Sequence, residues 1–577
     1  ELRKKFSPAD IRSEFIPLVV ISAPSMEWTD EYGNGEPLLD AEQLSEAWDP
    51  EVLRRSLQPL ADAAERWTET LKTRISEEKK AGDKWKRVYD EVLETAENTK
   101  SRMKKGIEIL GSDTMARLAF CFMNRAMSIG YRWSKKQGDN KLVWKPFQLA
   151  FILMEIPDIV DPNSKYRDYV DTLWVPTGGG KTEAYTGVIL FTLAYRRLKI
   201  LQNCREADVK RGDPVCYDGT SVMLRYTLRL LTVQQFQRLM NYIEACEYLR
   251  VWNLPEGPIG WRPHGYNGTR DFLWGTTPFS AGLWVGQELS PNTLVSSSDE
   301  SEGAPDMEPG AINILKNEKY DEGEYVEKST PVHIIRCPAC GTWLSFPRSV
   351  SNVDMKKGVF WVLRIKEGGD VKYLEDKLSG TLNKQGYSVE IIEYGNPSFI
   401  TLKVASENTL LLDYDKIKEL WDEIDKTLNE DIELASFSWR HPGYFPRTIL
   451  RSGKNDAIDF DIYCPNPGCD LRKKWIGGMP AGLFNENNES NLKPPSEYDC
   501  RKQFNLNLVD GNRFIAVHPA FRASCGYAPS EYVSDRVPIT AYTVDEQIYS
   551  RLPSVVIATV DKFARLPFNP EAGMIFG

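Results

Sequence analysis

A glycine-rich segment, Pro176-Thr-Gly-Gly-Gly-Lys-Thr182, contains the residue types of a phosphate-binding loop. In such a loop, the N–H groups of a glycine turn and of the first helical turn bind phosphate, a lysine neutralises its charge, and a hydroxyl binds Mg²⁺. We therefore expect a nucleoside triphosphate and Mg²⁺ as cofactors, with Lys181 and Thr182 in the catalytic roles. The other loop residues expected to contact the nucleotide are Thr177, Gly178, Gly179, Gly180 and Glu183. The competing interpretation is a glycine turn that only caps a helix.

A phosphate-binding loop must lie between a strand and a helix, and the flanking sequence predicts both. The apolar run 172–175 predicts the strand, and the amphipathic pattern of residues 183–200 predicts the helix. The form Pro-Thr-Gly-x-Gly-Lys-Thr resembles that of superfamily 2 helicases and translocases, which implies a nucleic-acid motor. These enzymes commonly carry an aromatic-Gln pair upstream of the loop, and Gln148, 33 residues before Lys181, matches it. The resemblance implies that Gln148 recognises adenine, and so selects ATP, whereas a lone glutamine on such a helix is otherwise a capping or surface residue.

The next strand and helix, predicted over 222–227 and 232–248, occupy the position of a helicase motif that holds the nucleic-acid backbone. Hydroxyl, amide and guanidinium groups at the end of a strand can bind phosphates. A second such loop follows the buried apolar strand 553–560, where Asp561 accompanies the candidate donors. An ordinary strand-to-helix turn would also tolerate Thr and Gln. The residues predicted to bind DNA are Arg225, Thr227, Arg229, Thr232, Gln234, Gln235, Thr559 and Lys562.

Two close pairs of cysteines have the spacing of metal-binding turns. One is Cys337-Pro-Ala-Cys340, after a predicted strand at 332–335, and the other is Cys464-Pro-Asn-Pro-Gly-Cys469, after a predicted strand at 460–463. Pairs of thiolates on tight turns favour tetrahedral Zn²⁺, and four thiolates leave no open position for catalysis. We therefore predict one structural Zn²⁺ site formed by these four residues. The alternatives are a disulfide or a redox Cys-x-x-Cys.

The chain has 577 residues, which is too long for one core, and we expect an α/β fold with several domains. The prediction is a RecA-like P-loop domain with a helical N-terminal domain and a large α+β zinc-containing insertion. The second RecA domain of such motors is not expected in this sequence. The insertion begins with an acidic loop (296–309), and its elements alternate as β-α-β-β-α: 359–365, 372–382, 387–394, 399–404 and 413–428. This order resembles part of a ferredoxin-like unit. The predicted domains are 1–143 (helical), 144–295 (first part of the RecA-like domain), 296–530 (insertion) and 531–577 (return to the RecA-like domain).

Further local patterns complete this prediction. A short strand is predicted over 15–22 and helices over 41–110, with Asp40 as an N-cap and a second helix capped at Ser112 or Asp113. Strand-like runs at 513–519 and 542–548 return toward the core sheet. The net charge of −10 argues against a chain that grips DNA along its whole surface. No apolar run reaches 18 residues, so we expect no membrane span and a cytoplasmic protein.

Five segments together resemble the DISARM helicase subunit family, DrmA. They are Pro-Phe-Gln-Leu-Ala-Phe-Ile-Leu (146–153), Pro-Thr-Gly-Gly-Gly-Lys-Thr-Glu-Ala-Tyr (176–185), Leu-Arg-Tyr-Thr-Leu-Arg-Leu-Leu-Thr (224–232), Gly-Leu-Trp-Val-Gly (282–286) and Ala-Thr-Val-Asp-Lys-Phe-Ala (558–564). The resemblance covers the chain from about residue 112 onward. It implies a DNA-directed ATPase of a bacterial anti-phage system, with a companion subunit, DrmB, and a DNA methyltransferase as partners.

The sequence departs from that family pattern before motif II, the Asp-Glu strand that holds Mg²⁺ and the hydrolytic water. Asp545-Glu546 fits motif II poorly, because it precedes the strand of Thr559. The chain also opens on Glu1 rather than Met. We therefore expect a fragment of a longer polypeptide, or one subunit of a split motor. Besides a DNA motor, a nucleotide-dependent DNA-binding scaffold or switch and an RNA helicase remain open.

Overall fold

The structure is a computed structural model of the chain. It describes residues 27–29, 35–81, 85–135, 141–176, 178–211, 219–227, 229–252, 258, 260–270, 272–275, 277–295, 310–317, 329–345, 358–365, 371–384, 388–395, 399–405, 432–438, 441, 443–451, 454–464, 469–473, 506–507 and 537–576. The predictions for 15–22, 296–309, 413–428 and 513–519, and for Thr177, lie outside these residues.

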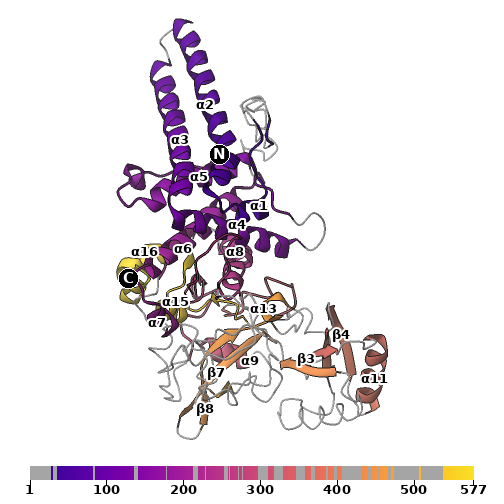
Figure 1. Cartoon of the computed structure of the whole chain (residues 1–577). Coiled ribbons are helices and arrows are strands. Elements are labelled where there is room, and N and C mark those ends of the chain that lie inside the picture. The colour runs from indigo at the N-terminus through magenta and orange to yellow at the C-terminus, as the bar shows by residue number, and fades with distance from the viewer. Residues whose placement is uncertain are drawn as a thin grey trace, which may run out of the picture.

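Helices dominate the chain up to residue 134, as predicted. They are α1 (Ala41–Glu46), α2 (Pro50–Ala81), α3 (Lys86–Ser112) and α4 (Thr114–Ser134). Asp40 caps α1 by accepting hydrogen bonds from the N–H groups of Glu42 (2.8 Å) and Gln43 (3.0 Å), and Asp113 caps α4 in the same way. Both predicted caps are confirmed, with Asp113 rather than Ser112 at the second. The helices α2 and α3 form a long antiparallel hairpin that projects from the rest of the molecule (Figure 1).

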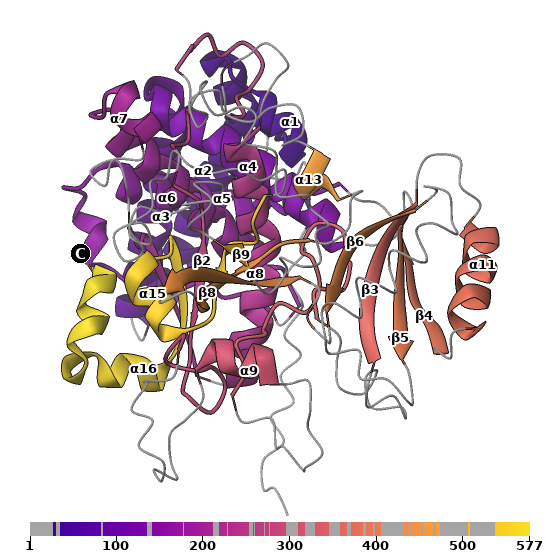
Figure 2. The same ribbon diagram turned by 90° about the horizontal axis from the view of Figure 1, so that it is seen from below.

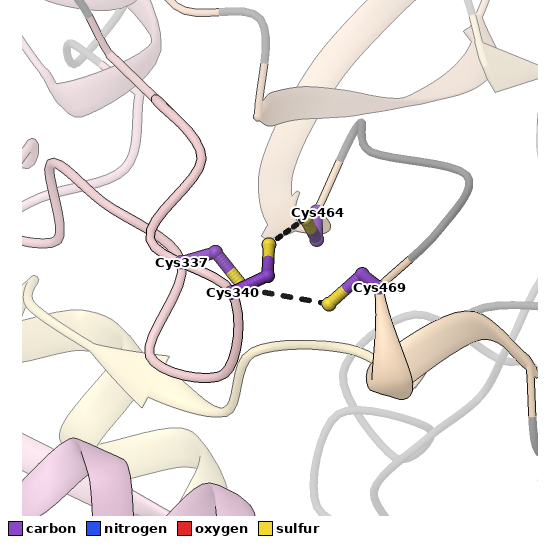
Figure 3. A group of neighbouring side chains, drawn as sticks. All are labelled: Cys337, Cys340, Cys464 and Cys469. Atoms are coloured by element: carbon purple, nitrogen blue, oxygen red, sulfur yellow. Dashed lines mark hydrogen bonds between the residues drawn. The ribbon is translucent and has the colours of Figure 1, made fainter. Parts of the chain in front are cut away.

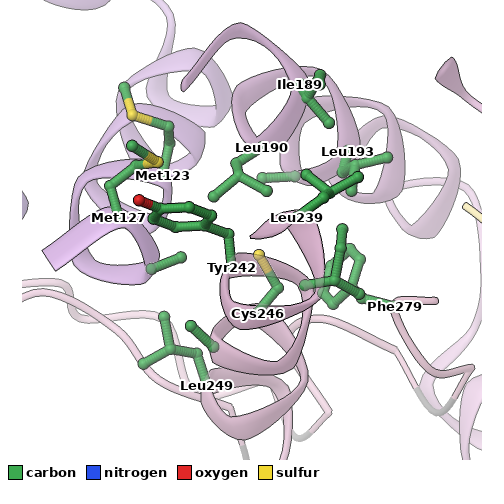
Figure 4. Packing of buried hydrophobic residues seen from close by; sticks show 14 of the residues in the cluster. Met123, Met127, Ile189, Leu190, Leu193, Leu239, Tyr242, Cys246, Leu249 and Phe279 are labelled. Carbon is green, nitrogen blue, oxygen red and sulfur yellow. The ribbon is translucent and has the colours of Figure 1, made fainter. Parts of the chain in front are cut away.

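A second set of helices packs directly on this first set. These are α5 (Pro146–Val160), α6 (Lys181–Leu201) and α8 (Arg229–Arg250), which are separated in sequence by a short 3-10 helix, η3 (Lys165–Asp168), and by α7 (Glu206–Arg211). The apolar sides of α5, α6 and α8 meet α4 in one core, where Met123 and Met127 lie near Leu190 and Tyr242 (Figure 4). The same buried cluster extends from Ala41 to Ile557. The helices of the first 134 residues therefore share their core with the α/β part, and the domain boundary at residue 143 remains a prediction.

The central sheet is parallel. It contains β1 (Val222–Tyr226), β2 (Ala281–Trp284), β10 (Ala541–Tyr542) and β11 (Val555–Thr559), in the order β1-β11-β2-β10. Each strand pairs with its neighbour in parallel register, for example Val222 with Val555 and Ala281 with Val555. The carboxyl ends of β1 and β11, which precede the two predicted DNA-binding loops, therefore lie side by side.

Both faces of this sheet are covered, as a parallel sheet requires. Along β11, Val555 and Ile557 belong to the main core, with α8 on that side, whereas Val556 and Ala558 belong to a second cluster. That second cluster lies under α15 (Asp545–Arg551), α16 (Val560–Arg565) and the 3-10 helices η9 (Leu566–Phe568) and η10 (Pro570–Phe576). The side-chain alternation of a strand thus places successive residues in different cores.

A region rich in antiparallel strands lies between β2 and β10 in sequence. Its first sheet has the order β4-β5-β3-β6, with all neighbours antiparallel, and stands to one side of the molecule with α11 (Figure 2). Its second sheet is a hairpin of β7 and β8, to which β9 adds in parallel. The strands are β3 (Gly358–Ile365), β4 (Ser388–Gly395), β5 (Phe399–Ala405), β6 (Ile432–Ser438), β7 (Tyr444–Arg451), β8 (Lys454–Ile462) and β9 (Leu506–Asn507). The helices are α9 (Ala311–Asn317), α11 (Val371–Lys384) and α13 (Asp470–Lys473).

The predicted β-α-β-β order of this region is confirmed by β3, α11, β4 and β5. Two predicted strands are wrong. Residues 172–175 lie outside every sheet, and Trp174 is 91% exposed, while residues 332–335 have no ladder beyond the isolated bridge that pairs Arg336 with Trp343. The predicted run 542–548 is a strand only at Tyr542, because α15 begins at Asp545. No helix among the described residues combines the length and apolar composition needed to cross a bilayer.

Candidate nucleotide site, nucleic-acid interface and cysteine cluster

The glycine segment forms a tight turn directly before α6. Gly178 and Gly180 have φ of +80° and +100°, in the left-handed region that glycine adopts at little cost, and the N–H of Gly179 donates to the carbonyl of Pro176 (2.9 Å). Lys181 is the first residue of α6 and Gly180 is its N-cap. The loop-to-helix half of the predicted motif is therefore present, even though the preceding strand is not.

The start of α5 braces this turn through two side chains. The ammonium of Lys145 donates to the carbonyl of Gly179 (2.9 Å), and the Nε2 of Gln148 donates to the carbonyl of Gly180 (2.7 Å). The Oε1 of Gln148 accepts from the N–H of Lys145 (2.8 Å), so both ends of the amide are engaged. Gln148 is only 3% exposed. In this arrangement the amide positions the glycine turn, and its contact with adenine remains a prediction.

The side chains that follow the turn are held locally. The ammonium of Lys181 donates to the carbonyls of Val175 and, at 3.3 Å, Pro176, which folds the lysine back over the loop. The hydroxyl of Thr182 lies 3.3 Å from that of Tyr185, and Glu183 forms an ion pair with Arg238 of α8 (3.0 Å). Lys145 and Tyr185 were not expected from the sequence. The only sequence signal for Tyr185 is its spacing of three residues from Thr182, which places both on one helix face.

The segment that leads into the glycine turn is tied to the helices by a charge cluster around the buried Arg102. Arg102 of α3 donates to Asp158 of α5 (2.5 Å) and to both carboxylate oxygens of Asp171 (2.7 Å each). Glu155 lies 3.8 Å from the same guanidinium. Burial and the neighbouring Asp171 raise the pKa of Glu155 to about 8, while the bond to Arg102 lowers the pKa of Asp171. Three carboxylates on one arginine therefore hold a proton near neutral pH.

The predicted DNA contacts divide into exposed and buried groups. Arg225 and Thr227 are exposed at the carboxyl end of β1, and Arg229 and Gln234 are exposed on the first turns of α8. Arg229 forms an ion pair with Glu288 and lies 3.9 Å from Asp561, and Gln235 accepts a hydrogen bond from Tyr185 (3.1 Å). The exposed residues come from the end of β1 and the start of α8 and can meet a phosphate backbone.

Of the remaining three predicted DNA contacts, two are buried and one is partly buried in an ion pair. Thr232 is fully buried and Thr559 is 1% exposed, so neither hydroxyl is open to a phosphate. Lys562 is 13% exposed and forms an ion pair with Asp545, whose pKa burial raises. Glu546 accepts the N–H of Leu294 (2.8 Å). Asp545 and Glu546 are thus engaged in structural contacts, in agreement with their poor fit to motif II.

The four predicted zinc ligands come together in space. All their sulfur atoms lie within 4.8 Å of one another, with Sγ–Sγ distances of 3.7 Å between Cys337 and Cys469 and 3.5 Å between Cys340 and Cys464 (Figure 3). Tetrahedral Zn²⁺ with bonds of about 2.3 Å requires sulfur atoms about 3.8 Å apart. None of the four forms a disulfide. Their spacing and number therefore fit a structural Zn²⁺.

Local geometry prepares the first pair of thiols. The N–H of Cys337 donates to the carbonyl of Thr342 (2.8 Å), the N–H of Gly341 donates to the carbonyl of Cys337 (2.9 Å), and Gly341 has φ +78°. Burial raises the pKa of Cys464, as it does for Cys337 and Cys469. A bound cation would be needed to keep such buried thiols ionised. The second pair follows β8 and leads into α13.

The described part of the chain is thus an α/β protein in which a glycine turn starts a helix beside a parallel sheet, with a four-cysteine cluster at the base of an antiparallel region. A curated protein of Bacillus paralicheniformis, "DISARM protein DrmA", is similar to it, with 32% identity over 351 residues. The match covers 58% of this chain and 27% of that protein, so the chain spans about a quarter of the length of its relative. No family model matches the chain.

Proposed function

We propose that the chain carries the nucleotide-binding part of an ATP-dependent superfamily 2 DNA helicase or translocase, acting in a DISARM-like anti-phage system. The observation that carries the proposal is the left-handed glycine turn, Gly178 to Gly180, that opens directly onto Lys181 at the start of α6. The 32% identity to a protein named for DISARM supports the biological setting. The proposed location is the bacterial cytoplasm, and the proposed partners are DNA, the companion subunit DrmB and a DNA methyltransferase.

The bracing from α5 suggests how the loop would present its N–H groups. In a trans peptide, the C=O and the following N–H point in opposite directions. Because Lys145 and Gln148 hold the carbonyls of Gly179 and Gly180, the N–H groups of Gly180 and Lys181 point away from α5. Two donors at the positive end of a helix are thereby available for one anionic group.

The functional side chains at this end of α6 have simple roles in the proposal. When bound, Mg·ATP would supply the phosphoryl group to be transferred and the charge to be neutralised. The ammonium of Lys181 would exchange the carbonyls of Val175 and Pro176 for phosphate oxygens, and the hydroxyl of Thr182 would face the metal. While no nucleotide is bound, these carbonyls accept hydrogen bonds from the Lys181 ammonium.

For DNA, the proposal rests on the exposed residues alone. Arg225, Thr227, Arg229 and Gln234 offer donors at the end of β1 and the start of α8. To bind a phosphate, Arg229 would have to break its ion pair with Glu288, which lowers the net binding free energy that this contact contributes. Such a phosphate contact positions the DNA backbone rather than reading its sequence. Thr232 and Thr559 are left out of the proposed surface because they are buried, and Lys562 because it is paired with Asp545.

The deciding experiment measures the ATPase rate of the full-length protein, with and without single-stranded and double-stranded DNA, in the wild type and in Lys181→Ala. Because the lysine neutralises charge in the transition state, we expect the variant to lose at least about 100-fold in rate. Lys199→Ala, at the exposed far end of α6, is the matched control and should keep wild-type turnover. Turnover retained in Lys181→Ala would exclude the glycine turn as the ATP site.

A second function, a nucleotide-dependent DNA-binding scaffold or switch without unwinding, is favoured by one observation. Residues 171–176 lie outside the sheet, so the loop has no strand to fix it from behind. A loop held by side chains of α3, α5 and Lys181 of α6, without a strand behind it, can change position when phosphate binds. Nucleotide binding without DNA-stimulated turnover, in the same assay, would favour this function over the motor.

A further inference from the structure

The hydroxyl of Tyr185 lies at the meeting point of three elements. It is 3.3 Å from the hydroxyl of Thr182 on α6, 3.1 Å from the Oε1 of Gln235 on α8, and 3.0 Å from the hydroxyl of Tyr226 at the end of β1. Thr182 belongs to the proposed nucleotide site, while Gln235 and Tyr226 lie within the elements that carry the proposed DNA contacts. One side chain thus touches both sites.

Proton counting shows that these contacts compete. A phenol has one O–H to donate and can accept through its oxygen. Tyr185 is positioned to donate to the hydroxyl of Thr182 and to the Oε1 of Gln235, which can only accept, so both contacts require the same proton. Burial raises the pKa of Tyr226, which keeps its phenol neutral and able to donate to Tyr185. The proton of Tyr185 therefore serves either Thr182 or Gln235, but not both.

We propose that Tyr185 couples the nucleotide site to the DNA-binding helix α8. The inference rests on the proposed function for the identity of the two ligands. When the lone pair of Thr182 faces a metal, its hydroxyl hydrogen is directed to Tyr185, and the proton of Tyr185 is committed to Gln235. That bond fixes Gln235 and the first turns of α8, where Arg229 and Gln234 lie. Without the nucleotide, Thr182 can take the proton instead and Gln235 is released.

The consequence is a linkage between two equilibria, which must be reciprocal. In the wild type we expect DNA to tighten Mg·ATP-analogue binding, and the analogue to tighten DNA binding, by the same factor of about five or more. Tyr185→Phe removes only the hydroxyl, so it should bring this factor close to one and change each separate affinity by less than about threefold. Tyr226→Phe leaves the Tyr185 hydroxyl and both of its competing acceptors in place, and should retain most of the linkage.

The test measures the dissociation constant of a fluorescent non-hydrolysable ATP analogue with Mg²⁺, with and without a saturating oligonucleotide, on the full chain. Tyr195→Phe is the matched control, because it removes a tyrosine hydroxyl from the same helix, where Tyr195 stacks on Phe191. Thermal unfolding of each variant separates a lost linkage from a lost fold. If Tyr185→Phe does not fold, Gln235→Leu replaces it, and linkage retained in Gln235→Leu would contradict the proposal. Wild-type linkage in Tyr185→Phe, or a wild type that binds both ligands independently, overturns the coupling but not the proposed function. A wild type that does not bind the analogue overturns both.

Discussion

At the residue scale, Gly180 has two reasons to be glycine, and they can be separated. Its φ of +100° is strained for any other residue, at a cost of about 1–3 kcal/mol. In addition, a Cβ at this position would lie 2.6 Å from the Nε2 of Gln148. Gly178 has a similar φ, but nothing lies within 4 Å of its Cβ position. Only Gly180 therefore tests whether α5 is packed against the turn.

We expect Gly180→Ala to destabilise the protein and weaken nucleotide binding more than Gly178→Ala does, because only the former displaces Gln148. In a Gln148→Ala background, the excess cost of Gly180→Ala should disappear and leave the backbone strain alone. Chemical denaturation of the four single and double variants measures these differences. An unchanged cost in that background would mean that Gln148 does not brace the turn.

Residue types in the sequence predict a site chemistry, but not which side chains are free to perform it. The glycine turn, Lys181 and Thr182 were predictable because the motif itself dictates backbone shape and charge. Lys562 has a side chain equally suited to phosphate binding, yet it forms an ion pair with Asp545, 17 residues earlier in the chain. Tyr185 gave no chemical signal, because its role depends on partners on β1 and α8. Such pairings arise from tertiary packing, which spacing along one chain does not report.

At the element scale, the segment before the glycine turn is the clearest difference between expectation and structure. Its apolar composition predicted a strand, but a strand needs a neighbour to satisfy its backbone groups. The described sheet has the order β1-β11-β2-β10 and does not include residues 172–175. The segment is instead held by the ion pair between Asp171 and Arg102. Helices α1 to α4 and β11 were predictable, because their periodicity and caps are local.

The charge cluster around Arg102 leads to a prediction about the pH dependence of stability. The pKa of Glu155 is about 8 in the folded state, against an ordinary value of 4.5. Between these values the folded state keeps a proton that the unfolded state releases, so this group's contribution to stability is complete below pH 4.5 and is lost as pH rises through 8. Glu155→Gln mimics the protonated form and should stabilise the protein at pH 8.5 relative to the wild type, by an amount on the order of a few kcal/mol.

Thermal unfolding from pH 5 to pH 9 measures this difference, and it should shrink toward zero at the acid end. Glu108→Gln, an exposed change on α3, is the control and should shift stability little at any pH. Limited proteolysis within 169–176 should be slower in Glu155→Gln than in the wild type at pH 8.5, because the glutamine stays neutral and adds no third negative charge beside Arg102. A pH-independent difference between Glu155→Gln and the wild type would contradict the assigned titration.

At the scale of the whole molecule, the cysteine cluster connects regions that are far apart in sequence. Cys337 and Cys340 follow β2 of the central sheet and α9, while Cys464 and Cys469 lie between β8 and α13. The hairpin of β7 and β8 is also anchored to α15, where Asp459 accepts from Gln547 (2.7 Å) and forms a buried ion pair with Arg551. The cluster and this anchor together fix the base of the antiparallel region against the parallel sheet.

We therefore expect the purified chain to contain about one Zn²⁺, and its removal to loosen this junction rather than the nucleotide site. Cys337→Ser should lower the zinc content measured by mass spectrometry and the unfolding temperature, because three thiolates hold Zn²⁺ less tightly and the buried loop around Gly341 loses its anchor. Cys204→Ser, a half-buried cysteine outside the cluster, should keep both values. Proteolysis should then cut first between β2 and β10, while the glycine turn retains its nucleotide affinity. An equal loss of nucleotide affinity would mean that the cluster supports the entire α/β core, and an unchanged zinc content would exclude these four residues as the site.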